Sequence, residues 1–391
     1  MSGPLAGVRV VDITHYGVGP WACTLLGQLG AEVIKVETLE GDRLSRFPPP
    51  YKNGITTVYI SLNLNKRCIA VDLSDEQSQA AVRELVAQAD ILIDNHRPGY
   101  LDRRGLGYED VKGLNPRLVY CACNGYGQRG PLRDMGSVDT FGQAVSGLAS
   151  VSGPVGGPPE GFHCSGLIDL TTSIYIVTGV LAALRHRAQT GQGQLVETSQ
   201  MQAATAMSSA RALEYFVSGE NPAPMGTGVG NIVPSRAFLA ADGKWVNVSA
   251  LDDATWQRLA TAVGLPDLSA DPRFDSNANR VAHRAQVEAP LEAAIRTRPS
   301  AEWITVLAEH QVPCGLYLTY NQLRIDAQVK EQQMLTGIDT HWGHVTVGGL
   351  PWRFGRTPGT IRAARRPGED TEAVLAGLRP DQETGQQRGE H

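Results

Sequence analysis

The sequence predicts an α/β protein whose larger part is a parallel sheet covered by helices on both faces. Over roughly the first half of the chain, short runs of mostly apolar, β-branched residues alternate with helical stretches. Strands buried on both faces read as continuous apolar runs, which is the pattern of a parallel sheet. From about residue 235 a hairpin followed by several helices predicts a smaller α+β domain.

The chain opens with a predicted strand–helix–strand unit. The first strand is expected at residues 8–13, where the run VRVVDI leads to a turn containing Gly17 and Gly19. The apolar stretch 21–30 predicts a helix, and AEVIKVE at 31–37 predicts the second strand. This order is a βαβ unit, and it places the two strands in parallel.

The same alternation continues toward residue 200. Further strands are predicted at residues 68–73, 89–95 and 117–125, with a helix at 75–88 between the first two. A segment rich in Gly, Ser and Pro follows at 126–166, and a long helix is predicted from Asp169 to about residue 188.

At roughly 150 residues per domain, the 391 residues predict about two to three domains, and changes in composition divide the chain into four segments. They are a large domain at 1–216, a linker or active-site loop at 217–234, a small α+β domain at 235–325, and a return to the large domain at 326–391 with a polar tail. The small domain contains a hairpin signal at Asp242–Gly243. Its helices are predicted at 252–263, 279–296 and 300–310.

Composition and charge exclude several classes of function. The 35 basic and 40 acidic residues give a net charge of −5 without a basic run, so no nucleic-acid partner is expected. Apolar stretches such as 174–184 are interrupted by Thr178 and Gly179 and look too short to span a bilayer. The sequence does not begin with a charged segment followed by an apolar one, so we expect a cytoplasmic protein without a membrane partner.

The first turn leaves two interpretations open. Gly17, Gly19 and Ala22 fit the GxGxxA pattern of dinucleotide-binding turns, and Glu37 ends the next strand at a suitable distance. Three residues separate the strand from Gly17, however, and glycines of a tight turn explain the pattern equally well. A nicotinamide-dependent dehydrogenase therefore remains an alternative that rests on this turn alone.

Asp169 is the candidate for catalysis in the middle of the chain. At the start of the longest predicted helix, an aspartate is most simply an N-cap whose carboxylate accepts a bond from the first-turn amides. The same position also suits a nucleophile, because the positive end of a helix keeps a carboxylate ionised. The residues around it favour the cap and leave the nucleophile open.

A second group of polar residues follows the strand at 89–95. The run Asn95 to Gly99 and the nearby Asp102 to Arg104 lie where the carboxyl end of a parallel strand is expected, which is where ligands of such sheets bind. Arginine at this place suits phosphate recognition, whereas a solvated surface loop is the alternative.

Taken together, these segments resemble the class III coenzyme A transferases, a family that also contains 2-methylacyl-CoA racemases. The resemblance runs through PLAGVRVVDITHYGVGP, LGAEVIKVE, NLNKRCIAVDL, DNHRPG and LDRRGLGYEDV, and then through SGLIDLTTSIYIVTGVLAALRHRAQTGQGQLVE. It resumes at DPRFDSNANRVAHR, VPCG and GEDTEAVL, so it covers nearly the whole chain.

The resemblance implies a Rossmann-like large domain, a small domain and an interlocked homodimer. It implies coenzyme A as the carrier, with no metal and no NAD, and it places the catalytic aspartate at Asp169. The glycine-rich lid over the active site falls on Gly226 to Gly230. The CoA-contacting positions fall on His15, Gly17, Val18, Asp72, Asn95, His96, Arg97 and Arg103.

Departures from the family pattern limit which of the family's reactions this chain is expected to catalyse. The racemases carry a histidine directly before an aspartate, and Val138 stands in its place before Asp139, so one of two proton-transferring groups is missing. Gln143 fits the transferase pattern, whereas Gly17 and the pair Asp139–Thr140 depart from formyl-CoA transferase. The predicted activity is transfer of CoA from an acyl-CoA donor to a carboxylic acid acceptor, with a racemase as the nearest alternative.

Overall fold

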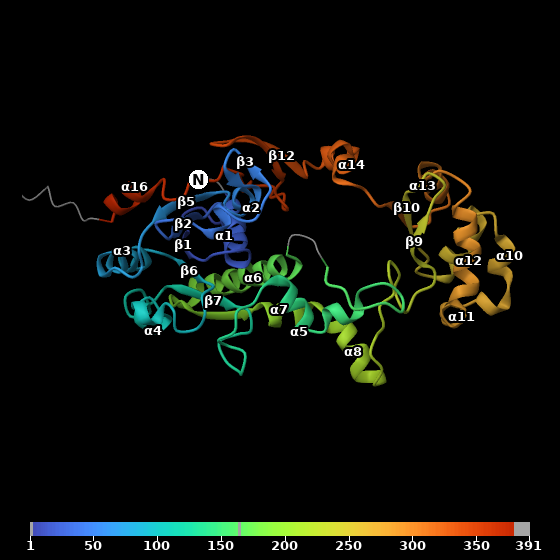
Figure 1. Cartoon of the computed structure of the whole chain (residues 1–391), viewed down its shortest axis with the longest axis horizontal. Coiled ribbons are helices and arrows are strands. Elements are labelled where there is room, and N and C mark those ends of the chain that lie inside the picture. The colour runs from blue at the N-terminus through green and yellow to red at the C-terminus, as the bar shows by residue number, and fades with distance from the viewer. Residues whose placement is uncertain (1–2, 163–165, 379–391) are drawn as a thin grey trace, which may run out of the picture. The chain divides into compact units, whose positions relative to one another are not determined.

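The computed structural model describes residues 3–162 and 166–378, and the chain divides into two compact units (Figure 1). The first unit comprises Met1–Ser146, Phe162–Ser209 and Ala327–His391, and the second comprises Gly147–Gly161 and Ala210–Asp326. The second unit therefore includes residues 147–161 and 210–216, which the sequence analysis placed in the large domain.

The first unit contains a six-stranded sheet in which all neighbouring strands are parallel, as the sequence predicts. The strands are β1 (Arg9–Ile13), β2 (Glu32–Glu37), β5 (Lys66–Ala70), β6 (Ile91–Asp94), β7 (Val119–Asn124) and β8 (Gln194–Ser199). Their order is β5-β2-β1-β6-β7-β8. Counted along the chain, this is 3-2-1-4-5-6, the order of doubly wound folds, whose direction reverses between β1 and β6.

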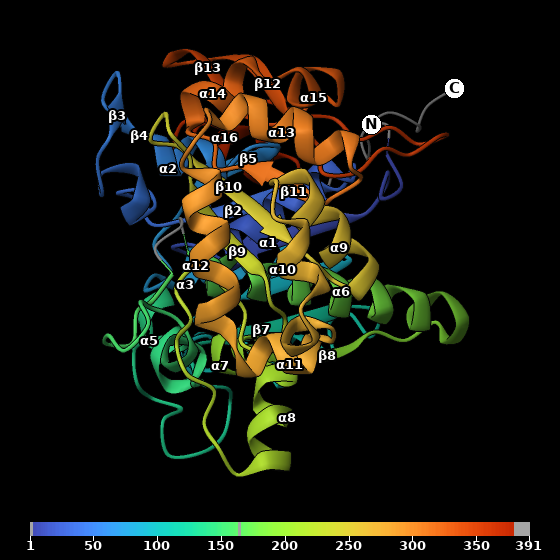
Figure 2. The same ribbon diagram turned by 90° about the vertical axis from the view of Figure 1, so that its right-hand side faces the viewer.

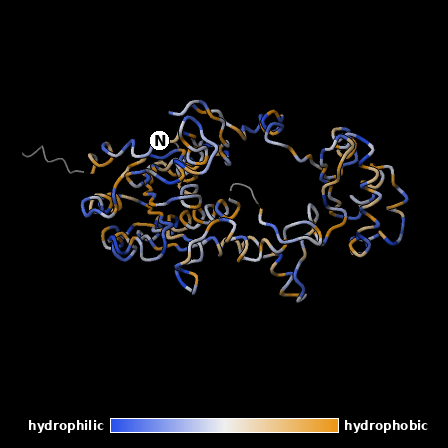
Figure 3. The backbone as a smooth tube through the Cα atoms, viewed as in Figure 1, coloured by the Kyte–Doolittle hydropathy of each residue, from blue (hydrophilic) through white to orange (hydrophobic). Residues whose placement is uncertain are grey.

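Helices cover both faces of this sheet. On one face α1 (Val18–Gln28) and α6 (Leu167–Thr190) lie side by side over strand residues such as Val10, Ile91 and Val119 (Figure 1). On the other face α3 (Glu76–Ala87), α4 (Tyr108–Val111) and α16 (Thr371–Ala376) cover residues such as Val11 and Leu92. Hydrophobic segments accordingly gather around the sheet and α6 in Figure 3.

The C-terminal segment returns to the open edge of the sheet. The Cys68 amide on β5 donates to the Asp370 carboxylate at 3.0 Å, and the Ala70 amide donates to Thr371 Oγ1 at 2.9 Å. These bonds cover an edge strand that would otherwise expose unpaired amides. Two small hairpins, β3 (Tyr51–Lys52) with β4 (Ile55–Thr56) and β12 (Leu335–Thr340) with β13 (Gly343–Gly348), and helix α2 (Thr57–Leu62) pack beside this edge.

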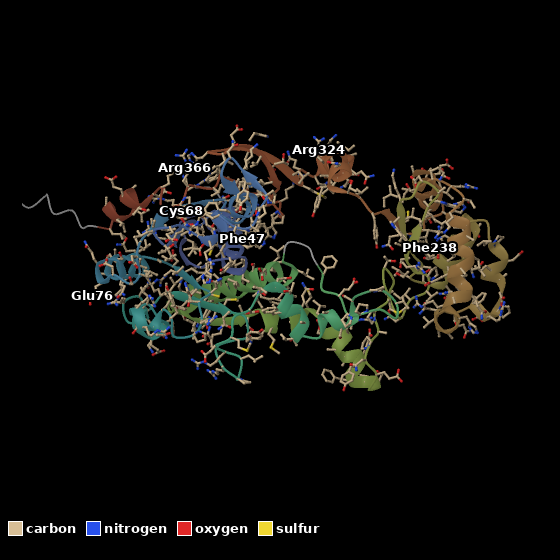
Figure 4. The ribbon with its side chains drawn as sticks, viewed as in Figure 1. Phe47, Cys68, Glu76, Phe238, Arg324 and Arg366 are labelled. Carbon is tan, nitrogen blue, oxygen red and sulfur yellow. The ribbon has the colours of Figure 1, made fainter. Side chains whose placement is uncertain are left out.

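The second unit has its own core and a separate antiparallel sheet. Strands β9 (Ser235–Leu239) and β10 (Trp245–Ser249) form the predicted hairpin, and β11 (Cys314–Leu316) adds a third strand. Its helices are α8 (Ser209–Ser218), α9 (Asp253–Ala262), α10 (Pro266–Ala270), α11 (Asn277–Ala282), α12 (Arg284–Ile295), α13 (Ser300–Glu309) and α14 (Tyr320–Ile325). The helix predicted at 279–296 is divided into α11 and α12, both labelled in Figure 2. Phe238, labelled in Figure 4, is buried in this core with Trp256 and Trp303.

Helix α6 differs from its prediction in two ways. It starts at Leu167, two residues before the expected start, and its 24 residues are longer than the apolar stretch seen in the sequence. An 18-residue window with a mean hydropathy of 1.8 makes α6 long and apolar enough to cross a membrane by length and composition, and 39% of this window is buried. The buried side packs against α1, and an exposed stripe includes Ile174, Thr178 and Leu181.

Candidate active site

A cleft of about 1000 Å³ lies at the carboxyl edge of the parallel sheet, within the first unit. Its walls are the segments that follow β1, β2, β5 and β6, so it adjoins the point where the strand order reverses. Ligands of doubly wound sheets bind at this point. The lining residues include His15, Tyr16, Lys35, Glu37, Asp42, Arg43, Arg46, Phe47, Asp72, His96, Tyr100 and Arg104. Figure 4 labels Phe47 among them.

Three of the residues predicted to contact CoA line the cleft directly: His15, Asp72 and His96. Asn95 holds the backbone of His15 from both sides, because its Oδ1 accepts from the His15 amide at 3.0 Å and its Nδ2 donates to the His15 carbonyl at 2.6 Å. Gly17 caps helix α1 and Val18 begins it, directly after the lining residue Tyr16.

The two arginines that the resemblance implies as CoA contacts, Arg97 and Arg103, lie against other parts of the first unit. The guanidinium of Arg97 lies against Gly136, and the guanidinium of Arg103 lies against Gly99. Neither side chain is among the lining residues of the cleft. Their contact with CoA stays a prediction from the resemblance.

Arg104, which the sequence analysis did not single out, is the arginine of this turn that faces the cleft. Its guanidinium carbon lies 3.8 Å from the centre of the Tyr100 ring, and that ring stacks on His96 at 4.2 Å between ring centres. Adjacent residues of a short 3₁₀ turn point in different directions, so the run Arg103–Arg104 did not tell which side chain enters the cleft.

Two basic side chains that line this cleft, His15 and Lys35, differ in charge at neutral pH. Burial and the neighbouring His96 lower the pKa of His15 to about 4, so His15 is neutral at pH 7. Lys35 stays charged, because its ion pair with Asp42 at 3.0 Å and the nearby Asp12 carboxylate raise its pKa despite burial. Glu37 is buried with a raised pKa, and its Oε2 atom has no hydrogen-bond partner within the described residues.

The N-cap of helix α6 is Gly166, and Asp169 is the third residue of the helix, so the cap interpretation of Asp169 is wrong. Gly166 has a φ of +85°, a conformation that favours glycine. The capping carboxylate comes from another element: Asp139, at the start of α5 (Asp139–Val145), accepts from the Ile168 amide at 2.6 Å and the Asp169 amide at 3.2 Å. This leaves the Asp169 side chain free for another role.

Gln143 fixes the capping carboxylate. Its Nε2 donates to Asp139 at 2.6 Å and to the Phe162 carbonyl at 3.0 Å, while its Oε1 accepts from the Phe162 amide at 2.6 Å. Gln143 is buried, and its hydrogen bonds connect α5 and the backbone at Phe162 to the carboxylate that caps α6.

The Asp169 carboxylate is partly buried and lies between two other elements. Gln200, the first residue of α7 (Gln200–Met207), donates from Nε2 to Asp169 Oδ1 at 2.5 Å. At the other oxygen, a Cβ atom on Gly17 would lie 2.2 Å from Asp169 Oδ2, so any side chain at position 17 would displace this oxygen. Burial and the Asp139 charge raise the pKa of Asp169 to about 6, against the lowering effect of Gln200.

This arrangement suits a carboxylate nucleophile beside a nucleotide-sized cleft. The turn after β1 links the two parts, since Tyr16 lines the cleft and the next residue, Gly17, touches Asp169. Within residues 3–162 and 166–378, no group of three or more His, Cys, Asp or Glu side chains could hold a metal ion. Gly226 to Gly230 belong to the second unit, and their role as a lid stays a prediction.

Comparison with known proteins identifies the class. The model of CoA-transferase family III matches residues 5–371, so the chain belongs to this family. It is an enzyme of this class, which moves CoA from an acyl-CoA to a carboxylic acid, as the sequence predicts.

Several curated relatives are about one-third identical to this chain. Succinyl-CoA:glutarate CoA-transferase of Mus musculus is 33% identical and covers 88% of this chain and 78% of its own length. Acetyl-CoA:oxalate CoA-transferase of Acetobacter aceti is 33% identical with 85% of each chain covered. Succinyl-CoA–D-citramalate CoA-transferase of Chloroflexus aurantiacus is 33% identical with 92% of this chain and 89% of its own covered.

Solved structures agree with the family. A CaiB/BaiF family protein from Brucella suis superposes with a TM-score of 0.87 at 32% identity, covering 97% of this chain and all of its own (100%). The protein Rv3272 from Mycobacterium tuberculosis superposes with a TM-score of 0.84 at 28% identity, covering 95% of this chain and 99% of its own.

Proposed function

We propose that this enzyme transfers CoA through a thioester formed on Asp169. The carboxylate attacks the carbonyl carbon of the donor thioester; the new C–O bond gives a mixed anhydride, and the C–S bond breaks to release CoA thiolate. The thiolate then attacks Cγ of Asp169 and expels the donor acid as a carboxylate. The acceptor acid repeats both steps in reverse, so charge and bond count balance without an energy source.

The observation that carries this proposal is the position of the Asp169 carboxylate. Asp139 satisfies the amides that a capping aspartate would otherwise engage, while Gly17 and Gln200 hold the carboxylate in a partly buried place. Partial burial removes water from the nucleophile and from the intermediates that it forms. A carboxylate with a pKa near 6 is still ionised at pH 7.

We assign the nucleotide part of CoA to the cleft at the sheet edge. Arg43, Arg46 and Arg104 supply cations for its phosphates, and the stacked rings of Tyr100 and His96 supply an aromatic surface. His15, Gly17, Val18, Asp72, Asn95, Arg97 and Arg103 complete the set implied by the resemblance. Arg104→Ala should raise KM for several acyl-CoA donors alike, because they share this portion of the substrate.

For the acceptor we propose a dicarboxylic acid. The relatives named above act on glutarate, oxalate and citramalate, and two of them take CoA from succinyl-CoA. Succinyl-CoA and acetyl-CoA with a series of dicarboxylic acids are therefore the first substrates to test. Monocarboxylic acids of matched length are the controls, and a preference for them would contradict this choice of acceptor.

We propose an interlocked homodimer that works in the cytoplasm. Apart from the resemblance, the support is apolar surface left open on each unit separately. On α6 this surface includes Ile174, which is 56% exposed, and on α8 it includes Phe216, which is 76% exposed. Such contiguous apolar stripes are typical of surfaces that a second copy covers.

The direct test of the nucleophile is Asp169→Asn. The amide cannot form the anhydride, so we expect transferase activity to disappear while CoA still binds. Binding is followed by the rise in thermal unfolding temperature on addition of CoA. Full transferase activity of this variant would refute the proposed mechanism.

A further inference from the structure

Gln200 makes a direct contact with the proposed nucleophile that no sequence motif predicted. It follows Ser199, the last residue of β8, and it is a buried residue, 5% exposed. Ser199 fixes the start of α7 by accepting from the Gln202 amide at 3.1 Å. The Gln200 amide is thereby held at the carboxyl edge of the sheet, with Nε2 2.5 Å from Asp169 Oδ1.

The two oxygens of the Asp169 carboxylate have different surroundings. Oδ1 accepts from Gln200, whereas Oδ2 lies where a Cβ atom on residue 17 would stand, a place left open by Gly17. The backbone at Asp169 is fixed as well: its amide donates to Asp139, and its carbonyl accepts from Ser173 Oγ at 2.8 Å. Rotation that exchanges the oxygens must break the bond to Gln200.

We propose that Gln200 is the oxyanion donor for the acyl carbon of Asp169, and that Oδ2 is the atom that forms and breaks the anhydride bond. This inference rests on the proposed function. In the first step Oδ2 bonds to the donor carbonyl carbon and CoA thiolate leaves. In the second step the thiolate attacks Cγ, negative charge moves onto Oδ1, and the Cγ–Oδ2 bond breaks as the donor acid departs with Oδ2.

The bond to Gln200 gains strength at the moment when charge develops on Oδ1. A donor that is already in place needs no reorganisation in the transition state, and removal of one such donor costs roughly 10²–10³-fold in kcat. The same amide serves the return step, in which the acceptor carboxylate attacks Cγ of the thioester. Because Gln200 is uncharged, it leaves the resting carboxylate free to act as a nucleophile.

Gln200→Met tests this role, because methionine keeps the length of the side chain and lacks the donor. We expect kcat to fall by roughly 10²–10³-fold with little change in KM for the acyl-CoA. Since Gln200 lowers the pKa of Asp169, the acid limb of the rate profile should move to higher pH. The matched control is Gln77→Met, the same substitution at an exposed position of α3, away from the start of α7, which should keep wild-type kcat.

Oxygen exchange in the unaltered enzyme tests the same proposal and does not depend on whether Gln200→Met folds. Turnover with an acceptor acid labelled with ¹⁸O should place one heavy oxygen in Asp169, at Oδ2, while Oδ1 keeps its original atom. Two heavy oxygens after a few turnovers would overturn the inference, as would wild-type kcat in Gln200→Met. Absence of any heavy oxygen in Asp169 of an active enzyme would instead refute the proposed function itself.

Discussion

The ionisation of Asp169 couples catalysis to stability. Its pKa is raised from 3.8 to about 6, first by burial and then by the charge of Asp139. The nucleophile must be ionised, so kcat/KM should fall below pH 6 with one proton taken up. A profile flat from pH 8 to pH 5 would argue against an ionised Asp169 as the attacking group.

The same shift predicts that Asp169 destabilises the fold at neutral pH. Between pH 3.8 and 6 the folded state binds more protons than the unfolded state, so this group lowers the free energy of unfolding as pH rises through that window. The full cost is present above pH 6 and vanishes below pH 3.8. Asp169→Asn should therefore unfold at a higher temperature than wild type at pH 7.5 and at a similar one near pH 3.5, as thermal unfolding at both pH values would show.

Gly17 is a second position where a single added atom would change the geometry of the active site. Its backbone is in the ordinary helical region, so alanine is conformationally acceptable, but the added Cβ would displace Asp169 Oδ2. We expect Gly17→Ala to lower kcat by about 10²-fold, the size of effect that a displacement of about 1 Å produces.

Gly113→Ala is a matched control that separates the displacement of Asp169 from the general effect of replacing a glycine by alanine. Gly113→Ala adds the same atom at a place where nothing lies within 4 Å, and it should keep wild-type kcat. Steady-state rates and unfolding temperatures of the two variants make the comparison. Equal kcat values would contradict the packing of Gly17 against Asp169.

The sequence drew attention to Asp169 as the catalytic candidate, but it did not reveal which residues contact Asp169 in the fold. Asp169 stands out because it lies near the start of a long apolar helix, although the cap interpretation fails since Gly166 takes the capping position. Gln200 and Asp139 meet Asp169 from 31 and 30 residues away in the chain. Such contacts depend on how strands and helices pack, and periodicity carries no information about them.

Helix α6 depends on a cap supplied by α5. Asp139→Ala leaves the amides of Ile168 and Asp169 unsatisfied, and we expect a loss of about 1 kcal/mol in the free energy of unfolding. Denaturant unfolding measures this loss. An unchanged unfolding midpoint would show that the cap does not stabilise α6.

Asp139→Asn separates the cap from the charge. An asparagine oxygen can still accept from the α6 amides, but the negative charge that raises the pKa of Asp169 is gone. The acid limb of the rate profile should therefore move to lower pH, opposite to the shift expected for Gln200→Met. A limb that stays in place would mean that Asp139 acts on Asp169 through structure alone.

Most strands of the parallel sheet could be predicted from the sequence, with element ends misplaced by a few residues. Apolar runs placed β1 and β2 to within one residue and β6 and β7 to within two, because strands buried on both faces have a simple pattern. By contrast, β8 is less apolar and was not singled out. The start of α6 was misplaced by two residues because a glycine cap carries no side-chain signal.

At the level of the whole chain, the strand order explains where the cleft lies. The reversal between β1 and β6 opens a crevice at the carboxyl edge, and the loops predicted to bind CoA meet there. The sequence could place these loops at one edge, since every strand of the sheet is parallel. It could not tell which side chains of each loop enter the cleft.

The assembly is the remaining prediction for the whole chain. A homodimer should give a mass of about twice 42.0 kDa by light scattering, and a threaded one should keep that mass on dilution. A mass near 42.0 kDa at micromolar concentration would refute it. Replacing Ile174 and Leu181 on α6 by polar residues should weaken the dimer if this stripe is covered by the partner.

The most direct test of the mechanism is chemical capture of the thioester on Asp169. The enzyme is incubated with succinyl-CoA, quenched with hydroxylamine and digested with trypsin, which releases residues 134–185 as one peptide. We predict a hydroxamate on Asp169 in this peptide, and none in Asp169→Asn. Absence of the hydroxamate from this peptide in an enzyme that turns over would contradict the mechanism. An acyl group on Cys164, which lies outside the described residues, would leave with hydroxylamine and give no hydroxamate on the peptide, and a racemase, which leaves the thioester intact, would also give none.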